Sequence, residues 1–379
     1  MSHAEKTMRR SGVRTIALCA TLGVTVLAGG RLGAGREGTT LGFLITRSSL
    51  AVYDNGMATD CPDGVDPTVE ENFQRRLAPA ERERLLKPEN AKEYAAIWKD
   101  TFITGPGDVN VCNNPKSFKD DPRHPPSRGA QGRVAFGMNL DGTTDGRATA
   151  VTCGHAKFEG PNGDKGVDNQ LYRATGCSKG YRGTGGSVQQ GGGIPSFLIE
   201  IRGVDNPQSD DRVEVGIYST DDVLIQSQNG GALPYQTFHI AANPRFHNET
   251  RGRIVNGEIV TDALDALYLK WRISTLGLFG EASENEFRRA RLQLRIEPDG
   301  GLIGQLGGYR PLMNISTSGY CCKATASTAN IDCAAHYNTL AVMADGDPDP
   351  ETGACTTISA VHTLKGIPAF VLHGSTGSR

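Results

Sequence analysis

Aromatic side chains and net charge are both scarce in this chain of 379 residues. Only 6% of the residues are aromatic, whereas glycine occupies 48 positions. A chain with so many turn-forming glycines and so few large rings does not suit a compact helical bundle. The 40 basic and 42 acidic residues leave a formal charge of only −2, which argues against a nucleic-acid partner.

Common catalytic and metal-binding motifs are also missing. The sequence has no C-x-x-C or C-x-x-C-H, which argues against a zinc ribbon, a thioredoxin-like motif and c-type haem. It has no G-x-S-x-G, H-E-x-x-H or phosphate-cradling G-x-x-x-x-G-K, the commonest signatures of hydrolases, metalloproteases and nucleotide-binding proteins. These absences favour a non-enzymatic protein.

The N-terminus has the pattern of an export signal. Basic residues precede residue 15, an apolar run extends from Thr15 to Ala28, and two glycines follow it. This order is typical of a cleaved secretory signal, and the run is shorter than the about 20 residues that a membrane-spanning helix needs. We therefore expect a periplasmic or extracellular protein without a membrane span after cleavage, or an N-terminal anchor if the signal stays. Removal of residues 1–30 leaves 36 basic and 41 acidic residues, a formal charge of −5.

Eight cysteines remain once the signal, with Cys19, is removed. An even number in an exported chain predicts up to four disulfides, whose pairing the sequence alone cannot fix. Proximity along the chain suggests Cys61 with Cys112, Cys153 with Cys177, and the last four among themselves. The vicinal pair Cys321 and Cys322 either closes on itself or bridges outward; the outward bridges to Cys333 and Cys355 strain the backbone less.

The coarse secondary structure is mainly β, with helices in two places. A strand is expected at 41–53, a charged helical stretch at 67–102 in which Pro79 and Pro88 each open a helix, and one more helix at 333–344. Asn256-Gly257 is the strongest hairpin signal, and the turn at 298–301 is the next. Further strands are expected at 196–202, 212–218, 237–241, 252–255, 258–261, 268–273, 287–297, 302–309 and 356–372.

These elements predict an antiparallel β-sandwich or jelly-roll-like fold with a small helical excursion near the N-terminus. The expected organisation is a signal peptide at 1–30 and a linker at 31–40. Residues 41–128 then hold the first strand, a helical module closed by a disulfide and a proline-rich connector. The β-sandwich, with its cysteine-rich and Asp/Gly-rich loops, follows at 129–373.

Three loops are rich in side-chain oxygens. They lie at 139–146, 162–170 and 345–351, beside glycines that let a loop curl around an ion. Calcium takes six to eight oxygen ligands from such loops, so they predict a structural calcium site, although none is a proper EF-hand. Plain Asx turns are the alternative. The expected ligands are Asn139, Asp141, Asp145, Asp164, Asp168, Asp345, Asp347 and Asp349.

One segment carries the candidate catalytic groups. His155, Asp168 and Arg173 could act as a general base, an orienting carboxylate and an anion clamp, although local hydrogen bonding within a cystine-closed loop is the favoured interpretation. The stretch Gly166-Val167-Asp168-Asn169-Gln170, followed by Tyr172-Arg173 and Gly176-Cys177, resembles a group of exported bacterial proteins without an assigned activity. The resemblance implies an exported, disulfide-bearing, β-rich protein.

Together the sequence favours an exported, disulfide-stabilised, calcium-binding protein that interacts with an envelope or extracellular ligand. The alternative is an extracellular hydrolase acting on a glycan, whose carboxylates converge only in the folded chain.

Overall fold

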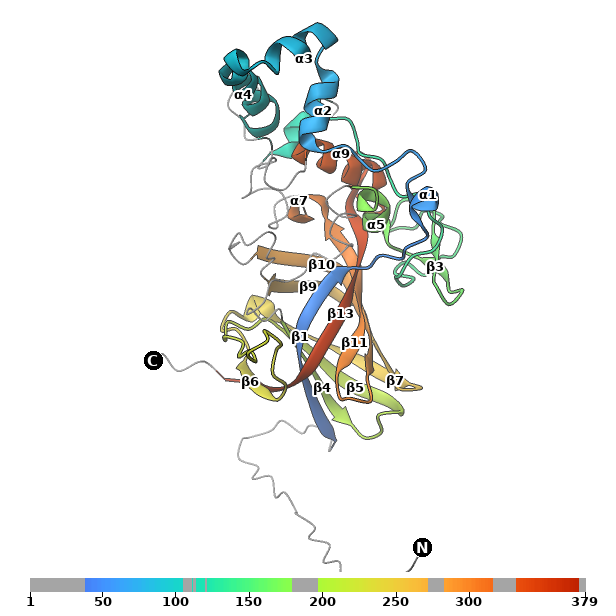
Figure 1. Cartoon of the computed structure of the whole chain (residues 1–379). Helices are drawn as coiled ribbons and strands as arrows, with labels where there is room; N and C mark the ends of the chain where they lie inside the picture. The colour runs from blue at the N-terminus through green and yellow to red at the C-terminus, as the bar shows by residue number, and fades with distance from the viewer. Residues whose placement is uncertain are drawn as a thin grey trace, which may run out of the picture. The chain divides into compact units, whose positions relative to one another are not determined.

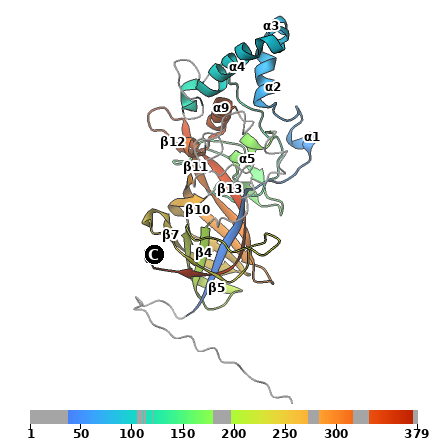
Figure 2. The same cartoon turned by 60° about the vertical axis from the view of Figure 1, so that its left-hand side comes forward.

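The computed structural model describes residues 38–104, 111, 114–119, 121–178, 197–271, 283–315 and 332–374. Its main body is one sheet, in which β1 (Thr39–Leu50) pairs with β4 on one side and with β13 on the other (Figures 1 and 2). The path β1-β4-β5-β7-β8-β10-β11-β13 therefore returns to its start as a closed, antiparallel, barrel-like sheet of eight strands. The other strands of this path are β4 (Phe197–Val204), β5 (Ser209–Tyr218), β7 (His247–Val255), β8 (Glu258–Thr261), β10 (Ser283–Ile296), β11 (Leu302–Pro311) and β13 (Cys355–Leu372).

Short strands extend this sheet or lie outside it. The first group is β6 (Gln236–His239), β9 (Leu264–Trp271) and β12 (Gly346–Pro348), of which β6 pairs in parallel with the end of β13. A separate ribbon joins β2 (Phe158–Glu159) to β3 (Lys165–Val167). The mainly antiparallel β fold with few helices is confirmed. The predicted sandwich is not confirmed, since the sheet closes on itself. A closed sheet and two stacked sheets both bury one face of every strand, so both give the same alternating sequence pattern.

Aliphatic side chains fill the inside of the closed sheet. Along β1, Phe43 and Ile45 join the interior cluster, whereas Leu44 between them belongs to a second cluster with Leu198 and Phe238. This period of two is the expected result of a pleated strand. Burying each such side chain stabilises the fold by about 1.5–3 kcal/mol. The interior also contains Ile199, Ile201, Val215, Ile217, Leu269, Leu292, Leu294, Leu306 and Leu364.

The strongest turn prediction is confirmed. Asn256 and Gly257 connect β7 to β8, with φ angles of 53° and 78°. Positive φ at both central residues is the geometry that twists with the flanking strands, and Asn-Gly tolerates it best. Pro298–Gly301 likewise lies between β10 and β11.

The predicted helical stretch is also confirmed. Its helix α2 (Val69–Arg76) begins with a capping box, in which Glu71 N donates to the Thr68 hydroxyl and Thr68 N donates to the Glu71 carboxylate. Pro79 opens α3 (Pro79–Leu85) and Pro88 opens η1 (Pro88–Asn90). The remaining elements of this stretch and its surroundings are α1 (Met57–Asp60), α4 (Ala91–Lys99), η2 (Asp100–Thr104) and η4 (Pro115–Phe118).

The later helices lie beyond the same end of the sheet as α2–α4 (Figures 1 and 2). The predicted C-terminal helix is α9 (Cys333–Met343), whose N-cap Asp332 accepts a hydrogen bond from Ala335 N. The others at this end are α5 (Gln170–Thr175) and α7 (Leu312–Ile315), whereas η5 (Pro244–Phe246) directly precedes β7 and lies beside β9. Among the described residues, no helix combines the length and apolarity needed to cross a membrane.

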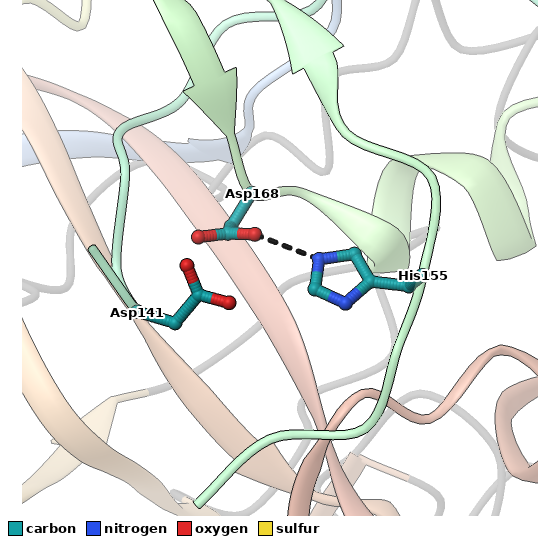
Figure 3. Close-up of side chains that lie close together, drawn as sticks. All are labelled: Asp141, His155 and Asp168. Atoms are coloured by element: carbon teal, nitrogen blue, oxygen red, sulfur yellow. Dashed lines mark hydrogen bonds and ion pairs between the residues drawn. The ribbon is translucent and has the colours of Figure 1, made fainter. Parts of the chain in front are cut away.

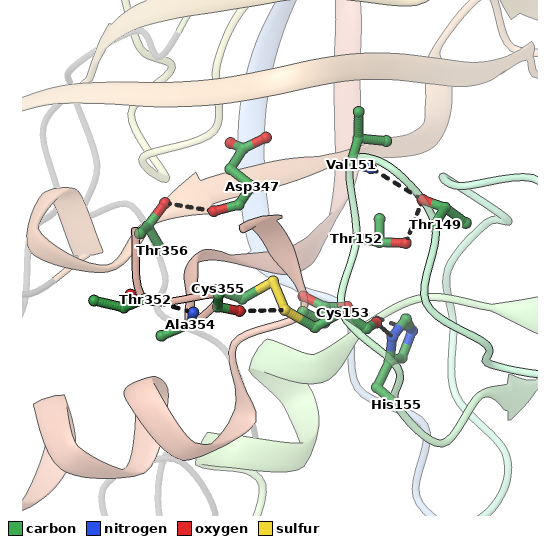
Figure 4. Close-up of a disulfide and its surroundings, with 12 residues drawn as sticks. Thr149, Val151, Thr152, Cys153, His155, Asp347, Thr352, Ala354, Cys355 and Thr356 are labelled. Atoms are coloured by element: carbon green, nitrogen blue, oxygen red, sulfur yellow. Dashed lines mark hydrogen bonds and ion pairs between the residues drawn. A yellow bond between two sulfur atoms is a disulfide. The ribbon is translucent and has the colours of Figure 1, made fainter. Parts of the chain in front are cut away.

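The described cysteines are disulfide-bonded as predicted, but Cys61, Cys153, Cys177 and Cys355 have other partners than their proximity along the chain suggested. Cys61 pairs with Cys177 across 116 residues. Cys153 pairs with Cys355 across 202 residues (Figure 4). The predicted bridge from Cys61 to Cys112 therefore does not close the helical module, because Cys61 is bonded to Cys177, which follows α5. Cys333 is also disulfide-bonded, whereas Cys112, Cys321 and Cys322 lie outside the described residues.

Candidate functional site

Five charged side chains from four chain segments meet beside β11 and β13. Asp141 comes from the first acidic loop, His155 and Lys157 from the stretch before β2, Asp168 from the residue after β3, and Asp345 from the residue before β12. We call these five residues the charge cluster. Figure 3 shows Asp141 and His155 on either side of Asp168.

Backbone contacts bring the four segments together. Asp168 N donates to Met138 O over 3.0 Å, and Cys153 N donates to Asp345 O over 3.0 Å. Gly166 permits the close approach of the first acidic loop, because its φ is +76° and a Cβ there would collide with Thr143 O. The cluster therefore forms where loops pack on the N-terminal part of β13. No helix or strand supplies two of its members.

The cluster is buried and densely paired. Lys157 Nζ donates to Asp141 Oδ1 at 2.7 Å and to Asp168 Oδ1 at 2.5 Å. His155 Nε2 lies 2.8 Å from Asp168 Oδ1 and 3.5 Å from Asp345 Oδ2. The exposed fractions are 0% for the three carboxylate side chains, 5% for Lys157 and 7% for His155.

Local hydrogen bonds fix the orientation of each group. Asp168 Oδ2 accepts from Leu140 N at 2.7 Å, and Asp345 accepts from Ser359 N at 2.6 Å. Asp141 Oδ1 accepts from Thr143 N in an Asx turn. His155 Nδ1 lies 3.0 Å from Cys153 O, and since a carbonyl only accepts, Nδ1 carries a proton.

The surroundings shift the pKa values of the cluster in opposite directions. Burial lowers the pKa of His155, but the hydrogen bond with Asp168 and the charge of Asp345 outweigh it and raise the pKa above 6.5. Burial raises the pKa of Asp345 to about 6, against the charge of His155. Burial also raises the pKa of Asp141, yet hydrogen bonds from Lys157 and Thr143 outweigh it and lower the pKa. Burial, reinforced by the nearby carboxylates, raises the pKa of Tyr309.

The predicted catalytic trio is only partly assembled. His155 and Asp168 are paired, but Arg173 does not join them. Its guanidinium lies 4.1 Å from the centroid of the Phe158 ring, and Nη1 donates to Ala130 O at 3.1 Å. Arg173 therefore makes local contacts on α5, as the favoured interpretation has it, and no hydrogen bond or ion pair among the described residues joins it to the His155–Asp168 pair.

Three of the eight predicted calcium ligands converge, namely Asp141, Asp168 and Asp345, one from each acidic loop. Asn139 Oδ1 instead accepts from Gly142 N, and Asp145 and Asp349 accept from backbone N–H groups of their own turns. Asp164 is exposed, and Asp347 pairs with Arg288 and Arg289 at 3.1 and 2.6 Å. Calcium binding stays a prediction.

Sequence reasoning missed two neighbours of these carboxylates. Lys157 is two residues from His155, so an extended chain points both side chains the same way, and this spacing was the available signal. Tyr309 lies on β11 opposite Ser359 of β13, and only the strand register places it near Asp345. Nothing local in the sequence marks that pairing.

The geometry restricts the chemistry of the cluster. Asp141, His155 and Asp168 each offer a ligand atom, all within 4.8 Å of one another, so they could hold a metal ion. As an acid–base site the cluster is closed to a polymeric substrate, because no side chain in it exceeds 7% exposure. No family model, curated protein or solved structure matches the chain.

Proposed function

We propose that this is an exported, non-enzymatic binding protein of the cell envelope that contacts a lipid surface. The observation that carries the proposal is an apolar patch on the outside of the fold, formed by the segment before β6 and the end of β13. Export is supported by the signal pattern and by long-range disulfides, which persist in oxidising compartments. The apolar patch consists of Val223, Ile225, Leu233, Tyr235, Phe370 and Leu372.

Direct contacts join the centre of the patch. Tyr235 and Phe370 have ring centroids 6.4 Å apart, and Tyr235 N donates to Pro368 O. The side-chain oxygen of Gln236 accepts a hydrogen bond from Ile225 N, and its side-chain nitrogen donates to Ile225 O and Leu233 O. These contacts hold two stretches of apolar side chains next to each other.

The exposure of the patch is high for large apolar residues. Val223 is 81% exposed, Tyr235 64% and Phe370 58%. Tyr235 also has a φ of 62°, a left-handed conformation that costs a non-glycine residue of the order of 1–3 kcal/mol. Adjacent exposed apolar side chains mark interaction sites, and an aromatic pair with aliphatic neighbours suits a bilayer interface.

Flotation of the exported mature protein with phosphatidylethanolamine/phosphatidylglycerol vesicles tests the proposal. We expect the wild type to float with the vesicles and Y235S/F370S to bind at least about tenfold more weakly, because two apolar contacts are lost. The control is V342S, which removes a 69% exposed residue of α9 outside the patch. A wild type that stays at the bottom, or a double variant that floats equally well, overturns the proposal.

An extracellular glycan hydrolase is the second candidate. It is favoured by the His155–Asp168 pair and by the raised pKa of Asp345, since an acid–base group in a glycosidase needs such a pKa. This candidate requires the cluster to open. Release of reducing sugar from envelope or extracellular polysaccharide by the wild type, lost in D345N with an unchanged melting temperature, would establish it in place of the binding role.

A further inference from the structure

We propose that the charge cluster binds one divalent first-row transition ion, of the Zn²⁺ or Mn²⁺ class. Its ligands are His155 Nε2 and the carboxylates of Asp141, Asp168 and Asp345. The proposal is independent of the lipid-binding role, because the apolar patch shares no residue with the cluster.

The spacing of the donor atoms suits a small ion. Ligands bound at about 2.1 Å to one ion lie about 3.0–3.4 Å from each other. His155 Nε2 is 2.8 Å from Asp168 Oδ1 and 3.5 Å from Asp345 Oδ2, and Asp141 offers an oxygen within 4.8 Å of both His155 and Asp168. Asp141, His155 and Asp168 therefore form the compact part of the ligand set, and Asp345 joins it through its 3.5 Å approach to His155 Nε2.

The imidazole is oriented for coordination. Because Nδ1 donates its proton to Cys153 O, neutral His155 has its lone pair on Nε2, the atom that faces Asp168 and Asp345. A histidine that ligates a metal through one ring nitrogen usually donates the N–H of the other to a carbonyl or carboxylate, as His155 does to Cys153 O.

The formal charge calls for a divalent cation. Three buried carboxylates and the Lys157 ammonium leave two negative charges without compensation when His155 is neutral. Uncompensated buried charge is costly, and a divalent ion cancels it. Lys157 stays on Oδ1 of Asp141 and of Asp168 as an outer hydrogen-bond donor. The ion takes Oδ2 of Asp141, whose own contact is the Thr152 hydroxyl at 3.5 Å.

Two buried polar atoms independently point to a missing ligand. Asp345 Oδ2 and the Tyr309 hydroxyl have no hydrogen-bond partner in the described part of the chain, and both residues are 0% exposed. Tyr309 lies opposite Ser359, whose N donates to Asp345, and it packs with Leu140, whose N donates to Asp168, so it lies beside the cluster. Buried polar groups are normally satisfied, so an ion and its water are the expected partners.

The donor set separates this ion from the calcium that the acidic loops predict. Calcium needs six to eight oxygens, whereas the cluster offers three carboxylates and one imidazole nitrogen. Imidazole suits zinc and manganese-type ions. The ion would join the loops at 139–168 to the residue before β12, next to the Cys153–Cys355 bridge that ties the same loop to β13 (Figure 4).

Metal titration of the mature, disulfide-intact protein tests the site. After exhaustive chelation, Zn²⁺ or Mn²⁺ should bind with one equivalent and raise the melting temperature by several degrees at an excess of about 100 times the Kd. Ca²⁺ and Mg²⁺ at equal concentration should have no effect. Absence of Zn²⁺ and Mn²⁺ binding, or a larger effect of Ca²⁺, overturns the proposal.

Variants locate the ion. H155Q should weaken binding by about 100-fold or more, while D349N, which changes an exposed turn carboxylate, should bind as the wild type does. Because H155Q also disturbs a buried pair, the wild type is examined with Mn²⁺ by pulsed EPR. Coupling to one imidazole nitrogen is expected. Bound Mn²⁺ without nitrogen coupling, or equal affinity in a folded H155Q, contradicts the assignment.

Discussion

The closed sheet and the charge cluster bury side chains by opposite means. Inside the sheet, Leu292 and its neighbours lose contact with water and need only shape and volume to match. In the cluster, Asp168 is equally buried but needs a donor for each oxygen, which Lys157 supplies to Oδ1 and Leu140 N supplies to Oδ2. The sheet therefore tolerates conservative changes, whereas the cluster depends on every partner being present.

The largest effect should come from Lys157→Met. This change leaves Asp141 and Asp168 buried without their shared ammonium, which costs about 3–5 kcal/mol in the free energy of unfolding. The matched control is Lys165→Met, whose ion pair with Glu159 is exposed and which should cost less than about 1 kcal/mol. Urea denaturation measures both. Equally small losses in the free energy of unfolding would show that Lys157 stabilises the fold no more than a lysine in an exposed ion pair does.

The sheet should respond to volume alone. Leu292→Ala opens a cavity at a side chain that is 0% exposed and should cost about 2–5 kcal/mol, whereas Leu292→Met should cost less than about 1.5 kcal/mol. The comparison uses the same urea denaturation. A methionine variant as unstable as the alanine variant would contradict the claim that the interior of the sheet accepts side chains of similar volume.

The bridge beside the cluster should stabilise it. Replacing Cys153 and Cys355 with serine removes a link across 202 residues and should cost about 2–4 kcal/mol. Because Cys153 O accepts from His155, the double variant should also lose affinity for Zn²⁺ or Mn²⁺, while the matched pair Cys61→Ser/Cys177→Ser should not. An identical metal affinity in both double variants would show that the Cys153–Cys355 bridge does not support metal binding by the cluster.

The smallest effect concerns an ion pair on the outside of the sheet. Tyr218 Oη donates to Glu249 at 2.6 Å, and this bond, with Arg202, lowers the pKa of Glu249 below 4.5 despite partial burial. A depressed carboxyl pKa adds stability that is complete above the unfolded value and is lost as the pH falls through the folded value. Glu249→Gln should therefore flatten the stability profile below about pH 4.5. An unchanged profile from pH 5 to 3 would contradict this.

The strands of the sheet could largely be predicted from the sequence. For the cluster, the sequence predicted most of the individual residues but not their assembly into one site. Alternation along 212–218 and the Asn256-Gly257 turn are local signals, so strands and hairpins followed from them. The closure of β1 on β13 and the pairing of Cys153 with Cys355 join residues hundreds of positions apart, for which the sequence has no local mark. The sequence marks Asp141, Asp168 and Asp345 each as an acidic loop residue, but their convergence depends on contacts between distant loops, such as the hydrogen bond from Cys153 N to Asp345 O.

The most direct test of the cluster as a metal site is anomalous diffraction from crystals grown with Zn²⁺, with data recorded on both sides of the zinc absorption edge. The account predicts a single strong peak within about 2.0–2.2 Å of His155 Nε2 and of carboxylate oxygens from the cluster. An ordered cluster with Lys157 on Asp141 and Asp168 and no anomalous peak would contradict it.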